Sequence, residues 1–213
     1  MQVTDITIQK NNPERSNVFV DGVYKFPSSQ ECLIKNDIFI GKEIDTELIE
    51  KILTEDEYKT ALDYAVKRLS YKPFSKKELI KVLEQKGYDV STIEKVIEKL
   101  LEYKYIDDKE LSRMIISDAT NLRKLGKRAV YTKMMNKKID DTTAKEALER
   151  YLPEDELQNA LFVIEKYARR YNFDGKDIKI KQKIYRALMA KGYSWDTIKE
   201  AFAKYDIEFN EDE

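Results

Sequence analysis

Residues 75–101 read SKKELIKVLEQKGYDVSTIEKVIEKLL, and this stretch decides the fold. Ser75 is followed three residues later by Glu78, a capping box in which each side chain bonds the other residue's backbone amide at a helix start. Apolar residues then recur at helical spacing until Gly87, which suits the left-handed C-terminal cap of a helix. A second box begins at Ser91. The stretch therefore predicts two short helices joined by a tight turn.

A further amphipathic run precedes this pair. It begins with another capping box at Thr54 and ends at Tyr71-Lys72-Pro73-Phe74, where proline removes a backbone donor. We therefore expect a three-helix unit that starts at Thr54.

The unit recurs at shifts of 51 and then 54 residues. Third helices are expected to be capped by Ser91, Thr142 and Asp196. The apolar positions of the first helices are Leu111, Met114, Ile115, Ala119 and Leu122 in the second unit, and Leu157, Ala160, Leu161, Ile164, Ala168 and Tyr171 in the third. The columns aligned across the units are Ser75/Gly126/Ile180, Leu79/Val130/Ile184, Leu83/Met134/Leu188, Gly87/Lys138/Gly192, Tyr88/Ile139/Tyr193, Ile93/Ala144/Ile198, Ile97/Leu148/Phe202 and Leu100/Tyr151/Tyr205.

These columns favour a tandem array over an irregular helical bundle, because caps, breaks and apolar positions coincide. We predict a mainly α fold of three tandem three-helix repeats that form a curved array, with a small N-terminal antiparallel β element. The expected ranges are 1–53 for the β element with a short helix, 54–106 for repeat 1, 107–152 for repeat 2 and 153–213 for repeat 3.

The β element is predicted from the first forty residues. Asp21-Gly22 separates two β-branched and aromatic runs, which is a hairpin signal. Asp5–Gln9 alternates polar and apolar residues, and Asp37–Lys42 could form a further short strand. We expect a short helix near Ser28–Ile34.

The composition excludes several kinds of site. The 213 residues include no His and one Cys, so no Ser–His–Asp triad, His metal ligand, internal disulfide or cysteine zinc site can form. There is no glycine-rich phosphate loop, and we expect no cofactor. No export signal or apolar run long enough to cross a bilayer is present, and we expect a cytoplasmic protein with no membrane partner.

Charge is balanced overall at −1 but clustered locally. Seven basic residues and no acidic one lie in 121–139, and nine basic and two acidic residues lie in 166–191. Such clusters attract phosphates. The candidate contacts with DNA or a DNA–protein filament are Arg123, Lys124, Lys127, Arg128, Lys133, Lys137, Lys138, Arg169, Arg170, Lys176, Lys179, Lys181, Lys183 and Arg186.

The same charges could instead form an ordinary solvated helix face whose lysine stems cover apolar surface. Tyr131, Tyr171 and Tyr185 lie among them and could stack on bases. One repeat could also act as a helix-turn-helix, although three copies with different second-helix surfaces fit array packing better. The pairs Asp107-Asp108 and Asp140-Asp141 are interpreted as helix caps rather than metal ligands.

The residues also resemble a known family. Ala61-Leu62-Asp63-Tyr64-Ala65, Lys72-Pro73, Lys86-Gly87-Tyr88, Tyr105-Ile106-Asp107-Asp108 and Ala190-Lys191-Gly192-Tyr193 are similar to the repeat patterns of RecX proteins. The β segment resembles that of the longer members from low-GC Gram-positive bacteria. Lys138 stands where the family usually has Gly, so that helix end needs either a different cap or a strained backbone.

The resemblance implies a non-enzymatic modulator of the RecA recombinase. Such a protein occupies the groove of the RecA–DNA filament, limits filament growth or promotes disassembly, and so lowers strand exchange, ATP hydrolysis and SOS induction. Some members bind single- and double-stranded DNA, and members from Gram-positive bacteria can have effects other than simple inhibition. We expect a monomer. The alternatives are a helical-repeat DNA-binding protein that acts independently of RecA and, less favoured by the composition, an enzyme.

Overall fold

The structure is a computed structural model that describes residues 1–173 and 175–205. The chain forms two compact units. The first contains Met1–Lys72 and Leu79–Tyr105, and the second contains Pro73–Glu78 and the chain from Ile106 onward. Each unit is described separately below.

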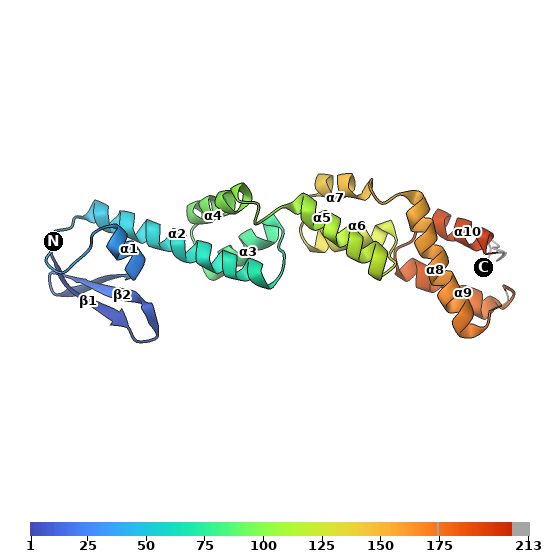
Figure 1. Cartoon of the computed structure of the whole chain (residues 1–213), viewed down its shortest axis with the longest axis horizontal. Helices are drawn as coiled ribbons and strands as arrows, with labels where there is room; N and C mark the ends of the chain where they lie inside the picture. Colours follow the sequence, from blue (N-terminus) through green and yellow to red (C-terminus); the bar gives the residue numbers. More distant parts are fainter. Residues whose placement is uncertain (174, 206–213) are drawn as a thin grey trace. The chain divides into compact units, whose positions relative to one another are not determined.

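The N-terminal β element is a three-stranded antiparallel sheet (Figure 1). Strands β1 (Val3–Gln9), β2 (Asn12–Val20) and β3 (Val23–Ser29) lie in the order β1-β2-β3. Asp21 and Gly22 join β2 to β3, and both have positive φ, as a two-residue hairpin turn requires. The hairpin prediction is confirmed.

A short helix, α1 (Gln30–Lys35), follows the sheet as expected, and the Ser29 hydroxyl caps it. The strand expected at Asp37–Lys42 is wrong. Asp37 and Gly41 both have positive φ, so the chain turns there instead of extending. The segment still meets the sheet, because the Gly41 amide donates to the Val3 carbonyl.

Helix α2 (Thr46–Tyr71) starts earlier than predicted, with Asp45 as its cap. The helix start expected at Thr54 is wrong, since the Thr54 hydroxyl donates to the Glu50 carbonyl within the helix. Ile52 of α2 belongs to the core of the β element, and Ala61 is buried further along the helix. One long helix therefore packs in the β element and also forms the first helix of repeat 1. The boundary expected between these two parts, at residues 53 and 54, falls inside this helix.

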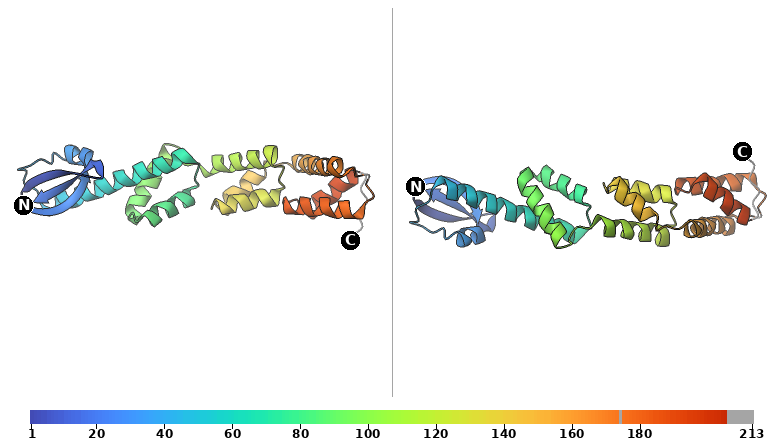
Figure 2. Two further views of the ribbon diagram at one scale, coloured as in Figure 1. Left: turned by 90° about the horizontal axis from the view of Figure 1, so that it is seen from below. Right: turned by 90° about the horizontal axis from the view of Figure 1, so that it is seen from above.

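The three-helix repeats are confirmed (Figure 2). The first repeat uses α2 with α3 (Lys76–Lys86) and α4 (Val90–Glu102). The second uses α5 (Asp108–Ser117), which continues into one π-helical turn, η1 (Asp118–Leu122), with α6 (Lys127–Asn136) and α7 (Asp141–Leu148). The third uses α8 (Pro153–Tyr171), α9 (Ile178–Ala190) and α10 (Trp195–Lys204).

The aligned apolar columns form the cores of the repeats. Leu79, Val130 and Ile184 are fully buried, and so are Leu83, Met134 and Leu188 in the next turn. Two predicted core positions are wrong: Met114 is 51% exposed and Leu122 is 79% exposed. The π-helical turn explains Leu122, because a wider turn rotates later residues away from the 3.6-residue register.

The predicted caps of the third helices are wrong by two residues in every repeat. The capping positions are Asp89, Asp140 and Ser194. Asp140 and Ser194 accept bonds from amides in the first turn of their own helices. In α4 the carboxylate of Glu57, from α2, accepts the bonds of the Asp89 amide and the Thr92 hydroxyl instead.

The expected capping box at Ser75 and Glu78 is confirmed. The left-handed positions after the second helices are also confirmed: φ is +90° at Gly87, +56° at Lys138 and +83° at Gly192. Lys138 thus adopts a conformation that costs a residue with a Cβ roughly 1–2 kcal/mol.

Neighbouring repeats of the second unit meet through helix ends. The Gly126 amide donates to the Lys191 carbonyl at 3.0 Å, and the Arg128 amide donates to the Gly192 carbonyl at 3.2 Å. The equivalent position one repeat earlier is Ser75, whose hydroxyl donates to the Lys137 carbonyl. The start of the second helix of each repeat is therefore bonded to the end of the second helix of the following repeat.

Carboxylates complete these junctions. The Lys76 amide, at the start of α3, donates to Asp108 of α5 at 2.9 Å. The Lys127 amide, at the start of α6, donates to Glu156 of α8 at 2.8 Å. Acidic groups are favourable at helix N-termini, so both junctions satisfy amides that have no partner inside their own helix.

Candidate nucleic-acid and partner interface

The first basic cluster surrounds α6. Part of its charge is neutralised internally, because Arg123 lies 3.1 Å and Lys133 3.8 Å from the carboxylate of Asp118. Lys137 pairs with Glu78 at 3.3 Å. These three side chains therefore offer less net positive charge to a partner than the sequence alone suggests.

The remaining members of the first cluster carry its outward charge. Arg128 is exposed at the first turn of α6. Lys124 and Lys127 are partly exposed and their amines lie over aromatic rings, at 5.4 Å from the centroid of Phe162 and 5.9 Å from that of Tyr151. Lys138 is partly exposed at the end of α6.

The second basic cluster lies on α8, α9 and the turn between them. Arg169 is bonded to Glu165 one turn earlier. Lys181 is almost entirely buried, so it is not available to a large partner. The other members, Arg170, Lys176, Lys179, Lys183 and Arg186, are exposed.

The three tyrosines considered for stacking are engaged in different ways. The Tyr131 hydroxyl donates to Asp141 at 2.6 Å, and this bond raises the pKa of the phenol. Lys183 lies 4.2 Å from the centroid of Tyr171, and its hydrogen bond lowers the pKa of that hydroxyl. Tyr185 packs against the core of the third repeat. Of the three, Tyr171 has the most cationic surroundings.

The structure connects the two clusters through Lys191 and Tyr193, which are not among the candidate contacts predicted from the sequence. The Lys191 amine donates to the Arg123 carbonyl at 2.6 Å, and the Tyr193 hydroxyl donates to the Lys124 carbonyl at 2.9 Å. Burial, followed by the neighbouring charge of Lys166, lowers the pKa of Lys191. Lys166 and Lys191 are the ends of the basic run 166–191, but only the tertiary structure shows that these two charges interact and that Lys191 bonds the end of η1.

The paired aspartates act as helix caps, as interpreted from the sequence. Asp107 accepts bonds from the amides of Lys109 and Glu110, and Asp140 accepts one from Thr142. Among residues 1–173 and 175–205, no group of three His, Cys, Asp or Glu residues could hold a metal ion. No helix in this part of the chain is long and apolar enough to cross a membrane.

The first unit contains a pocket of about 670 Å³ between α1, α2 and α4. Cys32, Tyr58 and Leu62 line it together with four lysines and four glutamates: Lys35, Lys59, Lys95, Lys99, Glu31, Glu55, Glu98 and Glu102. Burial raises the pKa of the Cys32 thiol, which therefore makes a poor nucleophile. The mixed charges of the lining give no preference for an anion.

Comparison with known proteins defines the family. Residues 1–45 match the Regulatory protein RecX N-terminal domain, residues 61–100 match the first RecX three-helix domain, and residues 154–202 match the third. Regulatory protein RecX of Bacillus subtilis (strain 168) is 34% identical over 211 residues, which are 99% of this chain and 79% of that protein. The chain belongs to the RecX family. Regulatory protein RecX of Clostridium botulinum (strain Alaska E43 / Type E3) is 31% identical and covers 93% of both chains.

Solved RecX structures agree with this assignment. A crystal structure of regulatory protein RecX matches with a TM-score of 0.67 and 26% identity over 93% of this chain and 98% of that one. The crystal structure of RecX from Lactobacillus salivarius gives a TM-score of 0.66 and 26% identity over 71% and 98%. The resemblance seen in the repeat columns is thus confirmed for the RecX fold and family.

Proposed function

We propose that this protein regulates the RecA recombinase by binding the RecA–DNA filament, without catalysing a reaction of its own. Membership of the RecX family across nearly the whole chain carries the proposal, because its relatives bear the name regulatory protein RecX. The exposed cations of the second unit support a role near a polyanion. Binding would occupy the filament groove and limit filament growth, RecA ATPase and strand exchange, and so SOS induction. We propose that it acts as a cytoplasmic monomer in which α2 joins the β element to repeat 1, and in which repeats 2 and 3 occupy 107–152 and 153–213.

The DNA-dependent ATPase of the cognate RecA on single-stranded DNA tests this proposal. Titrating the protein in at far fewer copies than RecA should already lower the ATPase rate, since a molecule that blocks filament growth acts on many subunits. An unchanged rate with intact filaments would contradict the proposal and would favour a DNA-binding role independent of RecA.

The charge-reversed variant Lys124→Glu, Lys127→Glu and Arg128→Glu should bind the RecA–DNA filament roughly tenfold or more weakly. Each lost phosphate contact should also reduce the slope of log affinity against log salt by about 1. Filament binding measured by fluorescence anisotropy at several salt concentrations gives both values, and circular dichroism shows that the variant is folded.

The matched control reverses three exposed lysines of the first unit, Lys67, Lys81 and Lys95, and so makes the same change in net charge. If position matters, this control keeps a higher affinity than the variant at α6. Equal loss in both variants, or no loss in the first, would rule out the α6 cluster as the contact surface.

A further inference from the structure

An exposed aromatic ring lies among cations on α8. Phe162 is 51% exposed, although it belongs to the most apolar class of side chains. The Lys124 amine lies 5.4 Å from its ring centroid. Lys166 and Arg169 follow at one and two helical turns, so they share this face of α8. A hollow of about 390 Å³ is lined by Phe162, Glu165, Lys166, Arg169 and Arg170.

Positive charge exceeds negative charge around this ring. Glu165 is the one carboxylate that lines the hollow among the described residues, and it is bonded to Arg169. Lys191 is a further cation near Lys166, and burial, followed by the charge of Lys166, lowers its pKa. An anion placed here would relieve the repulsion between these amines.

The combination of this ring with the amines of Lys124 and Lys166, which have no carboxylate partner among the described residues, indicates the chemistry of the ligand. Phosphate alone would use the amines and leave the apolar ring in water. An aliphatic partner would cover the ring but would bury the amines without counter-charges. A single-stranded nucleic acid satisfies both, since its bases stack on aromatic faces while its phosphates contact cations. The bases of duplex DNA are already stacked on one another, so none of them is free to stack on the ring.

We propose that Phe162 is a base-stacking platform for single-stranded nucleic acid, with Lys124 and Lys166 holding the flanking phosphates. This inference rests on the proposed function and deepens it, because it gives the filament-binding protein a specific contact with an unpaired strand. The Lys124 amine lies 5.4 Å from the Phe162 ring centroid, so its positive charge is beside any base that stacks on this ring.

Binding of a fluorescent oligothymidylate of about 20 nucleotides by the full chain tests the platform. Phe162→Ala should weaken binding roughly tenfold, and Phe162→Tyr should restore most of it. An abasic oligonucleotide of the same length should bind Phe162→Ala as well as it binds the wild type, because it offers phosphates without bases. Lys166→Glu should weaken binding to both oligonucleotides.

Phe39→Ala is the matched control, since Phe39 is a comparably exposed phenylalanine of the first unit at 59%. An oligouridylate arm distinguishes RNA from DNA, and a duplex arm should show no effect of Phe162→Ala. The platform is overturned if Phe162→Ala binds oligothymidylate like the wild type, if Phe39→Ala loses as much, or if the wild type does not bind the single strand. In each case an undiminished effect on the RecA ATPase would leave the proposed function standing.

Discussion

Gly192→Ala is expected to lower the free energy of unfolding of the second unit by about 3 kcal/mol. Gly192 has φ of +83°, and a Cβ there would overlap the backbone nitrogen and the Cβ of Ala129 in α6. The left-handed conformation costs an alanine roughly 1–2 kcal/mol, and forced overlap in a packed region costs roughly 1–3 kcal/mol more. Urea unfolding followed by circular dichroism, with hydrogen exchange to locate the change, measures the loss.

Gly87→Ala supplies the control for this substitution. Gly87 holds the equivalent position in the first repeat with φ of +90°, but a Cβ there would meet nothing within 4 Å. Gly87→Ala should therefore lower the free energy of unfolding only by the cost of the left-handed backbone conformation, about 1 kcal/mol. If the two variants were equally destabilised, close contact between α6 and the end of α9 would not be what requires glycine at position 192.

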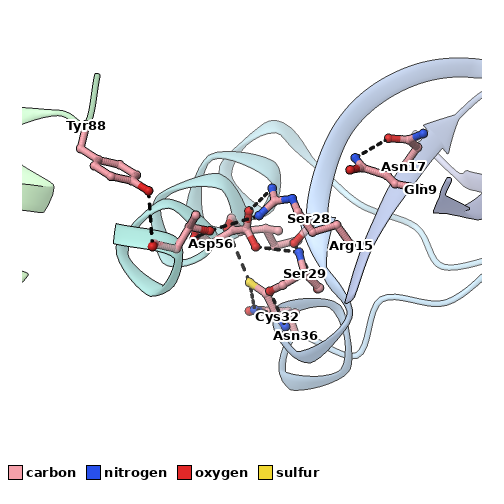
Figure 3. Close-up of polar contacts among 11 residues, drawn as sticks. Gln9, Arg15, Asn17, Ser28, Ser29, Cys32, Asn36, Asp56 and Tyr88 are labelled. Carbon is pink, nitrogen blue, oxygen red and sulfur yellow. Dashed lines mark hydrogen bonds and ion pairs between the residues drawn. The ribbon is translucent and has the colours of Figure 1, made fainter. Parts of the chain in front are cut away.

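Asp56→Ala is expected to detach the β-sheet from α2 and to destabilise the first unit by about 3 kcal/mol. The Asp56 side chain is 6% exposed, lies 2.6 Å from the Arg15 guanidinium and accepts the Ser29 amide at 2.6 Å (Figure 3). Arg15 also donates to the Thr60 hydroxyl. Removing the carboxylate leaves a mostly buried cation and a backbone donor without their partner. Thermal unfolding and hydrogen exchange of the β2 and β3 amides measure the effect.

Glu31→Gln serves as the comparison for Asp56→Ala. Glu31 also bonds a lysine of α2, Lys59, but its side chain is 74% exposed. Exposed ion pairs contribute at most about 1 kcal/mol, so stability should change little. A loss at Glu31, which lies on α1, as large as that at Asp56 would mean that ion pairs with α2 stabilise the first unit whether or not they are buried.

Local signals predicted the elements whose cause lies within a few residues. The Asp21-Gly22 hairpin follows from the positive φ that both turn residues adopt, and the Ser75 capping box from a bond three residues away. The strand expected at Asp37–Lys42 failed because a short apolar run carries no information on the positive φ at Asp37 and Gly41. The cap expected at Ser91 failed because α4 begins two residues earlier, with its cap at Asp89, whose amide donates to Glu57 of α2.

The candidate interface shows the same division. Clustering of basic residues is visible in the sequence, but pairing is not, and Lys133 and Lys137 are partly neutralised by Asp118 and Glu78. Lys181 belongs to a basic run and is nevertheless buried. Phe162 had no motif to mark it, because its role depends on a lysine 38 positions earlier in the chain.

The sequence by itself determined the three-helix period, the apolar columns, the left-handed helix ends and the RecX family, because each depends on residue types at fixed spacing. Only the tertiary structure decided how α2 is shared between the β element and the first repeat. It also decided which carboxylates accept amides at the start of a different helix and which cations remain exposed. Those outcomes depend on contacts between residues far apart in the chain, and such contacts are formed when helix ends and cores pack together.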